Sequence, residues 1–254
     1  MGVKSPRTRW ICHTDDMVEK KSPLRRSDTA PAPTAKIDAF LESVAKAPAP
    51  LSTSQGRLIF ALDATASRQP TWNEAMALQQ NLFLKTEGLH GLDVQLVFFR
   101  GEAECRATPW HTDSTDLLRA MKAVRCAAGR TQIERVLRHA RNEADKQPVS
   151  ALVLVGDCCE ELLDPLAGLA GELKLLGTPV FAFQEGNDPT AHHAFSRIAA
   201  LSGGAHAQFD LSSSHRLGEL LAAASVWARG GKAAVQSLQI AKQSDTIRAL
   251  LNQL

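Results

Sequence analysis

The sequence predicts an α/β fold with a doubly wound, mainly parallel sheet flanked by helices. From residue 57 onward, short apolar runs alternate with amphipathic segments, which is typical of parallel strands joined by crossover helices. Two of these runs, residues 58–62 and 151–155, are continuous rather than alternating, as expected of strands buried on both faces. Each is followed by a carboxylate, Asp63 and Asp157, at the strand end where open parallel sheets bind ligands.

The elements of this fold follow from local patterns. The segment beginning at Thr71 has the form of a capping box, Asp164 is expected to cap a helix with Pro165 in its first position, and Gly177 and Gly203 each follow an expected helix. In chain order we expect strand 58–62, a helix after Thr71, strand 92–99, short strand 104–110, helices near 117–124 and 133–140, strand 151–155, helix 164–176, strand 179–183, helix 195–202, strand 206–209 and a helix near 217–227.

Composition assigns these elements to one domain with extensions. The 254 residues leave room for an α/β domain at 56–230, which we expect to follow a disordered tail at 1–35 and an amphipathic helix with a proline-rich linker at 36–55. The tail mixes charges with few apolar side chains, and an electrostatic arm for a partner is its alternative interpretation. Residues 231–254 are predicted to be a helical extension that either folds back on the domain or binds a partner.

Charge and hydropathy indicate a cytoplasmic protein. Hydrophobic residues make up 44% of the sequence and charged residues 22%, as in soluble globular proteins. The formal net charge of +2 is too small to favour nucleic acid or an anionic membrane as a partner. No apolar run approaches the roughly 20 residues that span a bilayer, and the N-terminus lacks the apolar core of a secretory signal.

Residues with oxygen side-chain atoms stand in three loops of the expected fold. Asp63, Thr65 and Ser67 alternate after the first strand, Thr131 follows a glycine before a helix, and Asp157 ends a strand. A small hard cation such as Mg²⁺ prefers carboxylate and hydroxyl oxygens and commonly retains waters. The three segments therefore predict a cation site at the carboxyl edge of the sheet.

The order and spacing of these three loops resemble the metal-ion-dependent adhesion site of von Willebrand factor A (VWA) domains, over roughly residues 56–230. The resemblance implies a Rossmann-like VWA fold of the intracellular bacterial type, with a short antiparallel strand at one sheet edge. It also implies that the five residues above bind Mg²⁺, or Mn²⁺ or Ca²⁺, and that an Asp or Glu of a protein partner completes the coordination. The implied function is a non-catalytic interaction module, a scaffold or adaptor in an intracellular complex.

Two residues depart from the pattern of that family. Thr65 stands where serine is commoner, and the third loop reads Gly-Asp-Cys-Cys at 156–159, where the family more often has a hydroxyl residue before the aspartate and a glycine after it. Glu160 and Glu161 are then candidates to bend back and occupy the open coordination position.

Each expected ligand also has a purely structural interpretation. Thr131 and Glu134 form a capping box, Ser67 fits a turn, and Asp157 fits a helix cap or an exposed strand end. Asp63 is the hardest to explain in this way, because a carboxylate at the edge of an apolar core needs a partner.

The cysteines and histidines give weaker signals. Cys158 and Cys159 are conceivable soft metal ligands, but no matching Cys/His spacing accompanies them, so buried reduced thiols are expected. This favours a reducing compartment. His192 and His193 are adjacent on an expected helix and point in different directions, which favours exposed surface.

An enzyme is the alternative function, with Asp63 and Asp157 holding Mg²⁺ for phosphoryl transfer or hydrolysis. The sequence contains no dinucleotide or phosphate-loop motif after the first strand and no nucleophile elbow. No base, nucleophile or phosphate-binding lysine stands in a loop after a core strand, so binding is the favoured function. The partner's identity and the oligomeric state are not specified by the sequence.

Overall fold

The structure, a computed structural model, describes only part of the chain. The described residues all lie in the unit formed by residues 32–254, and they are 56–70, 72, 92–210, 221, 224–231 and 234. The predicted tail and linker, most of the C-terminal extension and the body of the helix after Thr71 lie outside these residues. The domain limits therefore stay predictions.

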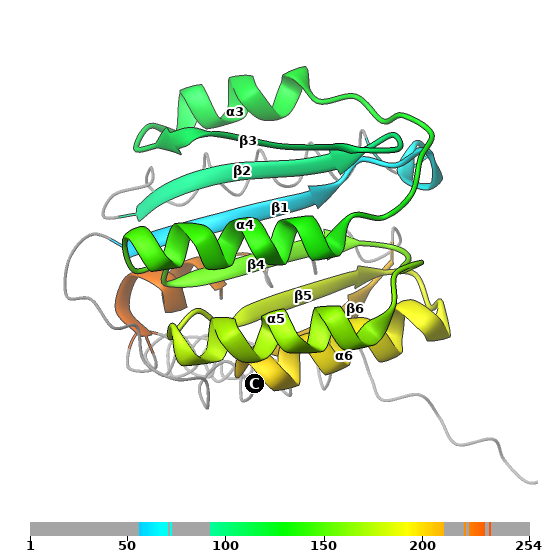
Figure 1. Ribbon diagram of the computed structural model, residues 1–254. Coiled ribbons are helices and arrows are strands. Elements are labelled where there is room, and N and C mark those ends of the chain that lie inside the picture. The colour runs from blue at the N-terminus through cyan, green and yellow to red at the C-terminus, as the bar shows by residue number, and fades with distance from the viewer. Residues whose placement is uncertain are drawn as a thin grey trace, which may run out of the picture. The chain divides into compact units, whose positions relative to one another are not determined.

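Six strands form one sheet in the order β3-β2-β1-β4-β5-β6 (Figure 1). Neighbouring strands are parallel except for β3, which pairs antiparallel with β2 at one edge. The strands are β1 (Gly56–Asp63), β2 (Leu92–Arg100), β3 (Glu104–His111), β4 (Ala151–Gly156), β5 (Val180–Glu185) and β6 (Ala205–Phe209). The mainly parallel sheet is as predicted, and so is the antiparallel edge strand.

Helices cover both faces of the sheet, which confirms the doubly wound arrangement. α4, α5 and α6 pack on one face, and α3, Trp72 and the helical residues between 221 and 231 pack on the other (Figure 1). The helices with described bounds are the short η1 (Ala66–Arg68), α3 (Ser114–Ala123), α4 (Ile133–Lys146), α5 (Leu163–Leu175) and α6 (Pro189–Ser202).

The central strand β1 shows why its sequence is continuously apolar. Phe60 and Leu62 point into the cluster beneath α3, whereas Ile59 and Ala61 point into the cluster beneath α4 and α5. Every residue of β1 is buried, because the strand lies between β2 and β4 and is covered on both faces. This position carries the last residue of β1, Asp63, to the carboxyl edge of the sheet.

The prediction for the start of α5 is wrong. The helix begins at Leu163, and Leu162 rather than Asp164 occupies the N-cap position. Pro165 is consequently the third helical residue, not the first. Proline is tolerated there because the amide groups of the first turn have no acceptor within the helix. The Asp164 carboxylate still lies in the first turn, where the positive end of the helix dipole stabilises its negative charge.

α6 begins six residues earlier than expected, at Pro189. The carboxylate of Asp188 accepts a hydrogen bond from the amide of Ala191 at 2.7 Å, and Pro189 starts the helix without losing a hydrogen bond. The helix ends at Gly203 in a left-handed conformation with φ of 77°, as its sequence predicts. Among the described residues, no helix combines the length and apolar character that crossing a bilayer requires.

The two-sided core leads to a stability prediction. Leu154 lies in β4 with no exposed surface, so Leu154→Ala should lower the free energy of unfolding by about 2–5 kcal/mol. The matched control is Leu162→Ala, because the Leu162 side chain is 81% exposed and its loss should change stability by less than about 0.5 kcal/mol. Urea unfolding of both variants measures the difference, and equal losses would contradict the assignment of β4 to the core.

Candidate metal centre

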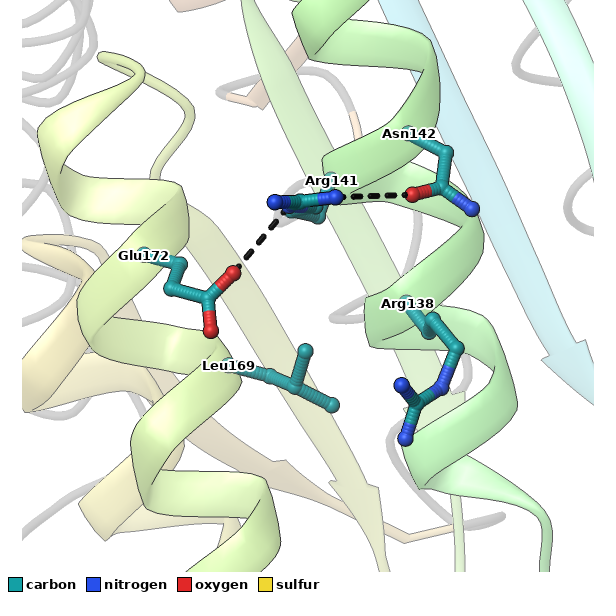
Figure 2. A pocket seen from close by; sticks show the side chains of 5 residues that line it. All are labelled: Arg138, Arg141, Asn142, Leu169 and Glu172. Carbon is teal, nitrogen blue, oxygen red and sulfur yellow. Dashed lines mark hydrogen bonds and ion pairs between the residues drawn. The ribbon is translucent and has the colours of Figure 1, made fainter.

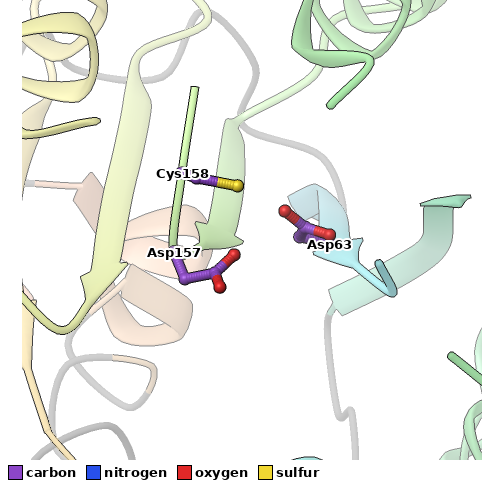
Figure 3. Close-up of side chains that lie close together, drawn as sticks. All are labelled: Asp63, Asp157 and Cys158. Carbon is purple, nitrogen blue, oxygen red and sulfur yellow. The ribbon is translucent and has the colours of Figure 1, made fainter. Parts of the chain in front are cut away.

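The carboxyl ends of β1 and β4 bring two carboxylates and a thiol together. These strands are parallel neighbours, with Leu62 paired to Val155, so Asp63 and the residues after β4 leave the sheet at the same edge. One ligand atom from each of Asp63, Asp157 and Cys158 lies within 4.8 Å of the other two. In Figure 3 the side chains of Asp157 and Cys158 reach toward Asp63 across the gap between the two strand ends. This cluster could hold a divalent metal ion.

The turn after β1 orients the Asp63 carboxylate. The amide of Thr65 donates a hydrogen bond to Asp63 Oδ1 at 2.8 Å, while Asp63 Oδ2 is buried and accepts no hydrogen bond from any described residue. The same is true of Asp157 Oδ1. A buried carboxylate oxygen without a donor is unfavourable, and a bound cation would relieve both. The donor set therefore fits a divalent cation.

The acidity of Asp63 reflects the same arrangement. The pKa of Asp63 is raised from its ordinary value of 3.8 to about 6, chiefly by burial and to a lesser degree by the nearby Asp157 charge, while hydrogen bonds from Thr65 and the charge of Arg68 act in the opposite direction. Without a cation, Asp63 therefore keeps its proton up to about pH 6, well above the pH at which an exposed aspartate loses it.

Gly156 fits the space beside Asp63. A Cβ atom at position 156 would lie 3.2 Å from Cζ of Phe195 and 3.4 Å from Cβ of Asp63. The glycine therefore lets the end of β4 approach Asp63 closely, but it provides no hydroxyl where the family more often has one. The glycine at position 156, which departs from the family pattern, thus stands where a side chain would be crowded by Phe195 and Asp63.

The two hydroxyl residues of the first motif share one turn. Thr65 Oγ1 and Ser67 Oγ are 3.0 Å apart and hydrogen bonded, with Thr65 buried and Ser67 exposed. Thr65 also forms an isolated parallel bridge with Ala127, which ties this turn to the segment before α4. The structure thus keeps Asp63, Thr65 and Ser67 together.

Thr131 is held by the loop that follows Asp157. Its hydroxyl oxygen accepts a hydrogen bond from the amide of Glu160 at 3.0 Å, and its own amide donates to Glu160 Oε2 at 3.2 Å. The alternative interpretation of Thr131 as a helix cap is wrong, because Gln132 is the N-cap residue and α4 has no side-chain cap of its own.

Glu161 performs the capping from outside the helix. Its carboxylate accepts hydrogen bonds from the amides of Ile133 at 2.6 Å and Glu134 at 2.9 Å. The idea that Glu160 or Glu161 bends back into the metal site is therefore wrong as well. The Glu160 carboxylate binds the amide of Thr131, just before α4, and the Glu161 carboxylate binds the unpaired amides of the first turn of α4.

The segment before α4 also needs its glycine. A Cβ atom at Gly129 would lie 2.1 Å from the carbonyl oxygen of Gly101, in the turn between β2 and β3. Gln132 donates from its side chain to the carbonyls of Arg100 and Gly101 at 3.0 and 3.2 Å. These contacts fix the position of Thr131 between the hairpin and the Asp157 loop.

The role of Cys158 was not predicted from the sequence. No cysteine or histidine lies at metal-ligand spacing from it in the sequence, and its neighbours in the structure are two carboxylates that the pairing of β1 with β4 brings together. Burial and the adjacent Asp157 raise the pKa of the Cys158 thiol, and burial also raises that of Cys126. The four described cysteines, Cys105, Cys126, Cys158 and Cys159, are free thiols.

Sequence reasoning missed a buried ion pair beside the site. Arg68, whose side chain is fully buried, donates to Glu185 Oε2 from Nε at 2.9 Å and Nη2 at 2.7 Å. Its Nη1 donates to the carbonyl oxygen of Asp63 at 3.1 Å. A signal for Glu185 exists in the sequence, because it is an acid at the end of an apolar strand, as Asp63 and Asp157 are. The predicted strand ends at residue 183, two residues too early to include it.

The remaining candidates have structural explanations. His192 and His193 are exposed, as predicted, and the His192 ring contacts the ring of His206 with centroids 4.9 Å apart. Burial lowers the pKa of His206 to about 4, so this histidine is neutral at pH 7. Trp110 donates to Glu143 at 3.0 Å, at the far end of the sheet from the cluster.

A pocket of about 350 Å³ lies between α4 and α5 (Figure 2). Arg141 pairs there with Glu172 at 3.1 Å and with Asp145 at 3.4 Å. Its lining contains no predicted metal ligand and consists of Arg138, Arg141, Asn142, Leu169 and Glu172.

Comparisons with known proteins bear on the fold. No protein-family model and no curated protein matches the chain. A VWA protein from Catenulispora acidiphila aligns at 17% identity over 68% of this chain and 43% of its own, with a TM-score of 0.55. Proximal thread matrix protein 1 from the mussel byssus aligns at 16% identity over 67% of this chain and 46% of its own, with a TM-score of 0.53.

A second structure of the mussel protein has zinc in its metal-ion-dependent adhesion site and aligns at 15% identity, over 70% of this chain and 47% of its own, with a TM-score of 0.54. The chain spans somewhat less than half the length of these proteins. At such identities the likeness shows the fold, and that fold is the VWA fold.

The raised pKa of Asp63 leads to a prediction about pH. In chelator, the folded protein should bind the Asp63 proton more tightly than the unfolded chain, so the free energy of unfolding should fall as pH rises from about 4 to about 6. Asp63→Asn keeps the Oδ1 acceptor for Thr65 and removes the charge. Above pH 6 this variant should be more stable than the parent by up to about 3 kcal/mol, at about 1.4 kcal/mol per pKa unit.

Urea unfolding of parent and variant between pH 4 and 8 measures this difference. Other carboxylates titrate equally in both proteins, so the difference isolates Asp63. Parallel pH profiles would show that the Asp63 carboxylate is not perturbed.

The buried ion pair leads to a second prediction. Arg68→Met should lower the free energy of unfolding by about 3–5 kcal/mol, because it leaves the Glu185 carboxylate buried beside no cation. Adding Glu185→Met should restore much of that loss, since removing both charges also removes their desolvation cost. Chemical unfolding of the two variants checks this, and an additive double variant would argue against direct pairing.

Proposed function

We propose that this chain is a non-catalytic protein-binding module whose contact with its partner runs through a divalent metal ion. The metal is held by Asp63, Thr65, Ser67, Thr131 and Asp157, and these oxygen ligands suit Mg²⁺, Mn²⁺ or Ca²⁺. The observation that carries the proposal is the pair of buried carboxylate oxygens, one on Asp63 and one on Asp157, that accept no hydrogen bond within the described structure.

The partner presents an Asp or Glu side chain to the metal. Ser67 is exposed and Asp157 only half-buried, so one side of the site faces outward. A hard cation there retains exchangeable positions that a carboxylate from another protein can occupy. The chain's own Glu160 and Glu161 do not compete, because their carboxylates bind the amides at the start of α4.

Binding is better supported than catalysis by the groups around the cluster. A phosphoryl-transfer site needs a cation free to meet phosphate, whereas the Arg68 guanidinium is buried and bound to Glu185. A hydrolase using a thiol nucleophile needs a lowered thiol pKa, whereas burial raises the pKa of Cys126, the half-buried thiol beside the cluster. The enzyme alternative therefore has less support from these residues.

The solved structures add support at the level of the site. The mussel protein holds zinc in its metal-ion-dependent adhesion site, so a protein of this fold can bind a divalent ion. A role as scaffold or adaptor in a cytoplasmic complex, with neither nucleic acid nor membrane as partner, belongs to the same proposal.

Selection from a peptide library tests the proposal. The full chain is immobilised and exposed to random displayed peptides, once with millimolar Mg²⁺ and Mn²⁺ and once with chelator. Peptides retained only with metal should be enriched in Asp or Glu, and Asp63→Asn should retain far fewer of them, because the metal forms the contact. Arg138→Ala, on the outer side of α4, is the control and should retain the same set.

The opposite results are equally clear. Retention of the same peptides with chelator would contradict a metal-dependent contact, and enrichment without acidic residues would contradict carboxylate recognition.

A further inference from the structure

Cys158 places sulfur in a site whose other expected ligands are oxygen atoms. Its Sγ atom and one oxygen from each of Asp63 and Asp157 lie mutually within 4.8 Å. We propose that Cys158 is a third charged ligand and that the site consequently selects a thiophilic divalent ion, Zn²⁺ foremost, over Mg²⁺. This inference rests on the proposed function, because it assigns the metal of the same site.

The spacing of the three atoms fits zinc after a small adjustment. Zn²⁺ binds carboxylate oxygen at about 2.0–2.2 Å and thiolate sulfur at about 2.3 Å, so tetrahedral ligand atoms are roughly 3.5 Å apart. The present spacing, at most 4.8 Å, therefore has to contract by about 1.3 Å at most. Asp157 and Cys158 lie beyond the end of β4, outside regular secondary structure, where side-chain rotation can provide that contraction.

Asp63 supplies a ligand that is already oriented. Its Oδ1 is fixed by the amide of Thr65, and Oδ2, on a residue with no exposed surface, has no described hydrogen-bond donor. Fixing one carboxylate oxygen through a neighbouring donor is how proteins orient metal ligands. The buried Oδ2 is thus an independent indication that the cluster binds a cation.

The hydroxyl ligands expected for Mg²⁺ are already hydrogen bonded. Thr65 and Ser67 hydrogen bond with each other, and the Thr131 hydroxyl accepts from the Glu160 amide. Mg²⁺ requires nearly octahedral oxygen ligands and has little affinity for sulfur, whereas zinc accepts thiolate and carboxylate together. The groups that converge here therefore match zinc more closely.

With zinc, Cys158 replaces the three hydroxyl ligands of the proposed oxygen site, and three protein ligands leave one tetrahedral position open. A zinc ion with three ligands from the chain keeps a fourth position for water or an incoming group. A carboxylate from a partner protein fits this position, since Zn²⁺ binds Asp and Glu oxygens at ordinary distances. The inferred metal thus preserves the recognition chemistry of the proposed function while changing the ion.

Titration of the reduced full chain with Zn²⁺, Mg²⁺ and Co²⁺ tests the inference. Zn²⁺ should bind at least about 100-fold more tightly than Mg²⁺, and Cys158→Ser should weaken Zn²⁺ by at least about 10- to 100-fold while changing Mg²⁺ by less than about threefold. Bound Co²⁺ should show sulfur-to-cobalt charge-transfer absorption. Cys126→Ser is the matched control, since Cys126 is another half-buried thiol close enough to feel the charges of Asp63 and Asp157.

The outcomes separate this inference from the proposed function. Loss of the absorption in Cys158→Ser but not in Cys126→Ser, and its loss in Asp63→Asn, supports the inference. If Mg²⁺ binds in an Asp63-dependent manner while Zn²⁺ is unaffected by Cys158→Ser, the inference fails and the proposed function stands. Absorption that persists in Cys158→Ser would place the cobalt on another thiol, and absorption that persists in Asp63→Asn would remove Asp63 from the ligand set; either result overturns the assignment. If no ion binds to the parent chain, both fail.

Discussion

The burial of the Asp63 carboxylate beside Asp157 is the constraint on which the carboxyl edge of this sheet depends. Parallel pairing of β1 with β4 sets the two strand ends side by side, and each end places a carboxylate where water is scarce. The raised pKa of Asp63 expresses the cost of that arrangement. Structures of this kind persist when something else recovers the cost, and a cation between the carboxylates does so directly.

The charged side chains nearest to Asp63 and Asp157 form their hydrogen bonds with other groups. Arg68 is the cation that touches Asp63, but it donates to the backbone carbonyl and directs its charge to Glu185. Glu160 and Glu161, the nearest acids in sequence after the cysteines, bind backbone amides at the start of α4 instead. The Arg68 guanidinium and the carboxylates of Glu160 and Glu161 thereby form their hydrogen bonds outside the side-chain cluster of Asp63, Asp157 and Cys158.

The fold could be predicted from the sequence because a strand buried on both faces is a continuous run of apolar residues. The continuous apolar run of β1 and the acid that ends it identify a central strand and its functional end within residues 58–63. The start of α5 was misplaced because Pro165 is acceptable at more than one position of a first turn, and local preference does not choose between them.

The site was only partly predictable, for a different reason. Asp63 and Asp157 could be named since each follows its own strand. The contacts of Thr131 with Glu160, and of Arg68 with Glu185, join residues 29 and 117 positions apart. No local pattern encodes which partner such a residue meets. The contact of Cys158 with Asp63 could not be predicted for the same reason, because only the pairing of β1 with β4 brings these two residues together.

The cap on α4 has a consequence for the order in which the chain is built. Glu161 lies 28 residues beyond the amide of Ile133 that it binds, whereas helix caps usually lie within the same turn. During synthesis the body of α4 therefore leaves the ribosome well before its cap exists. Its first turn can be completed only after β4 has joined the sheet, so maturation of this edge of the molecule waits for translation of the loop that carries Asp157.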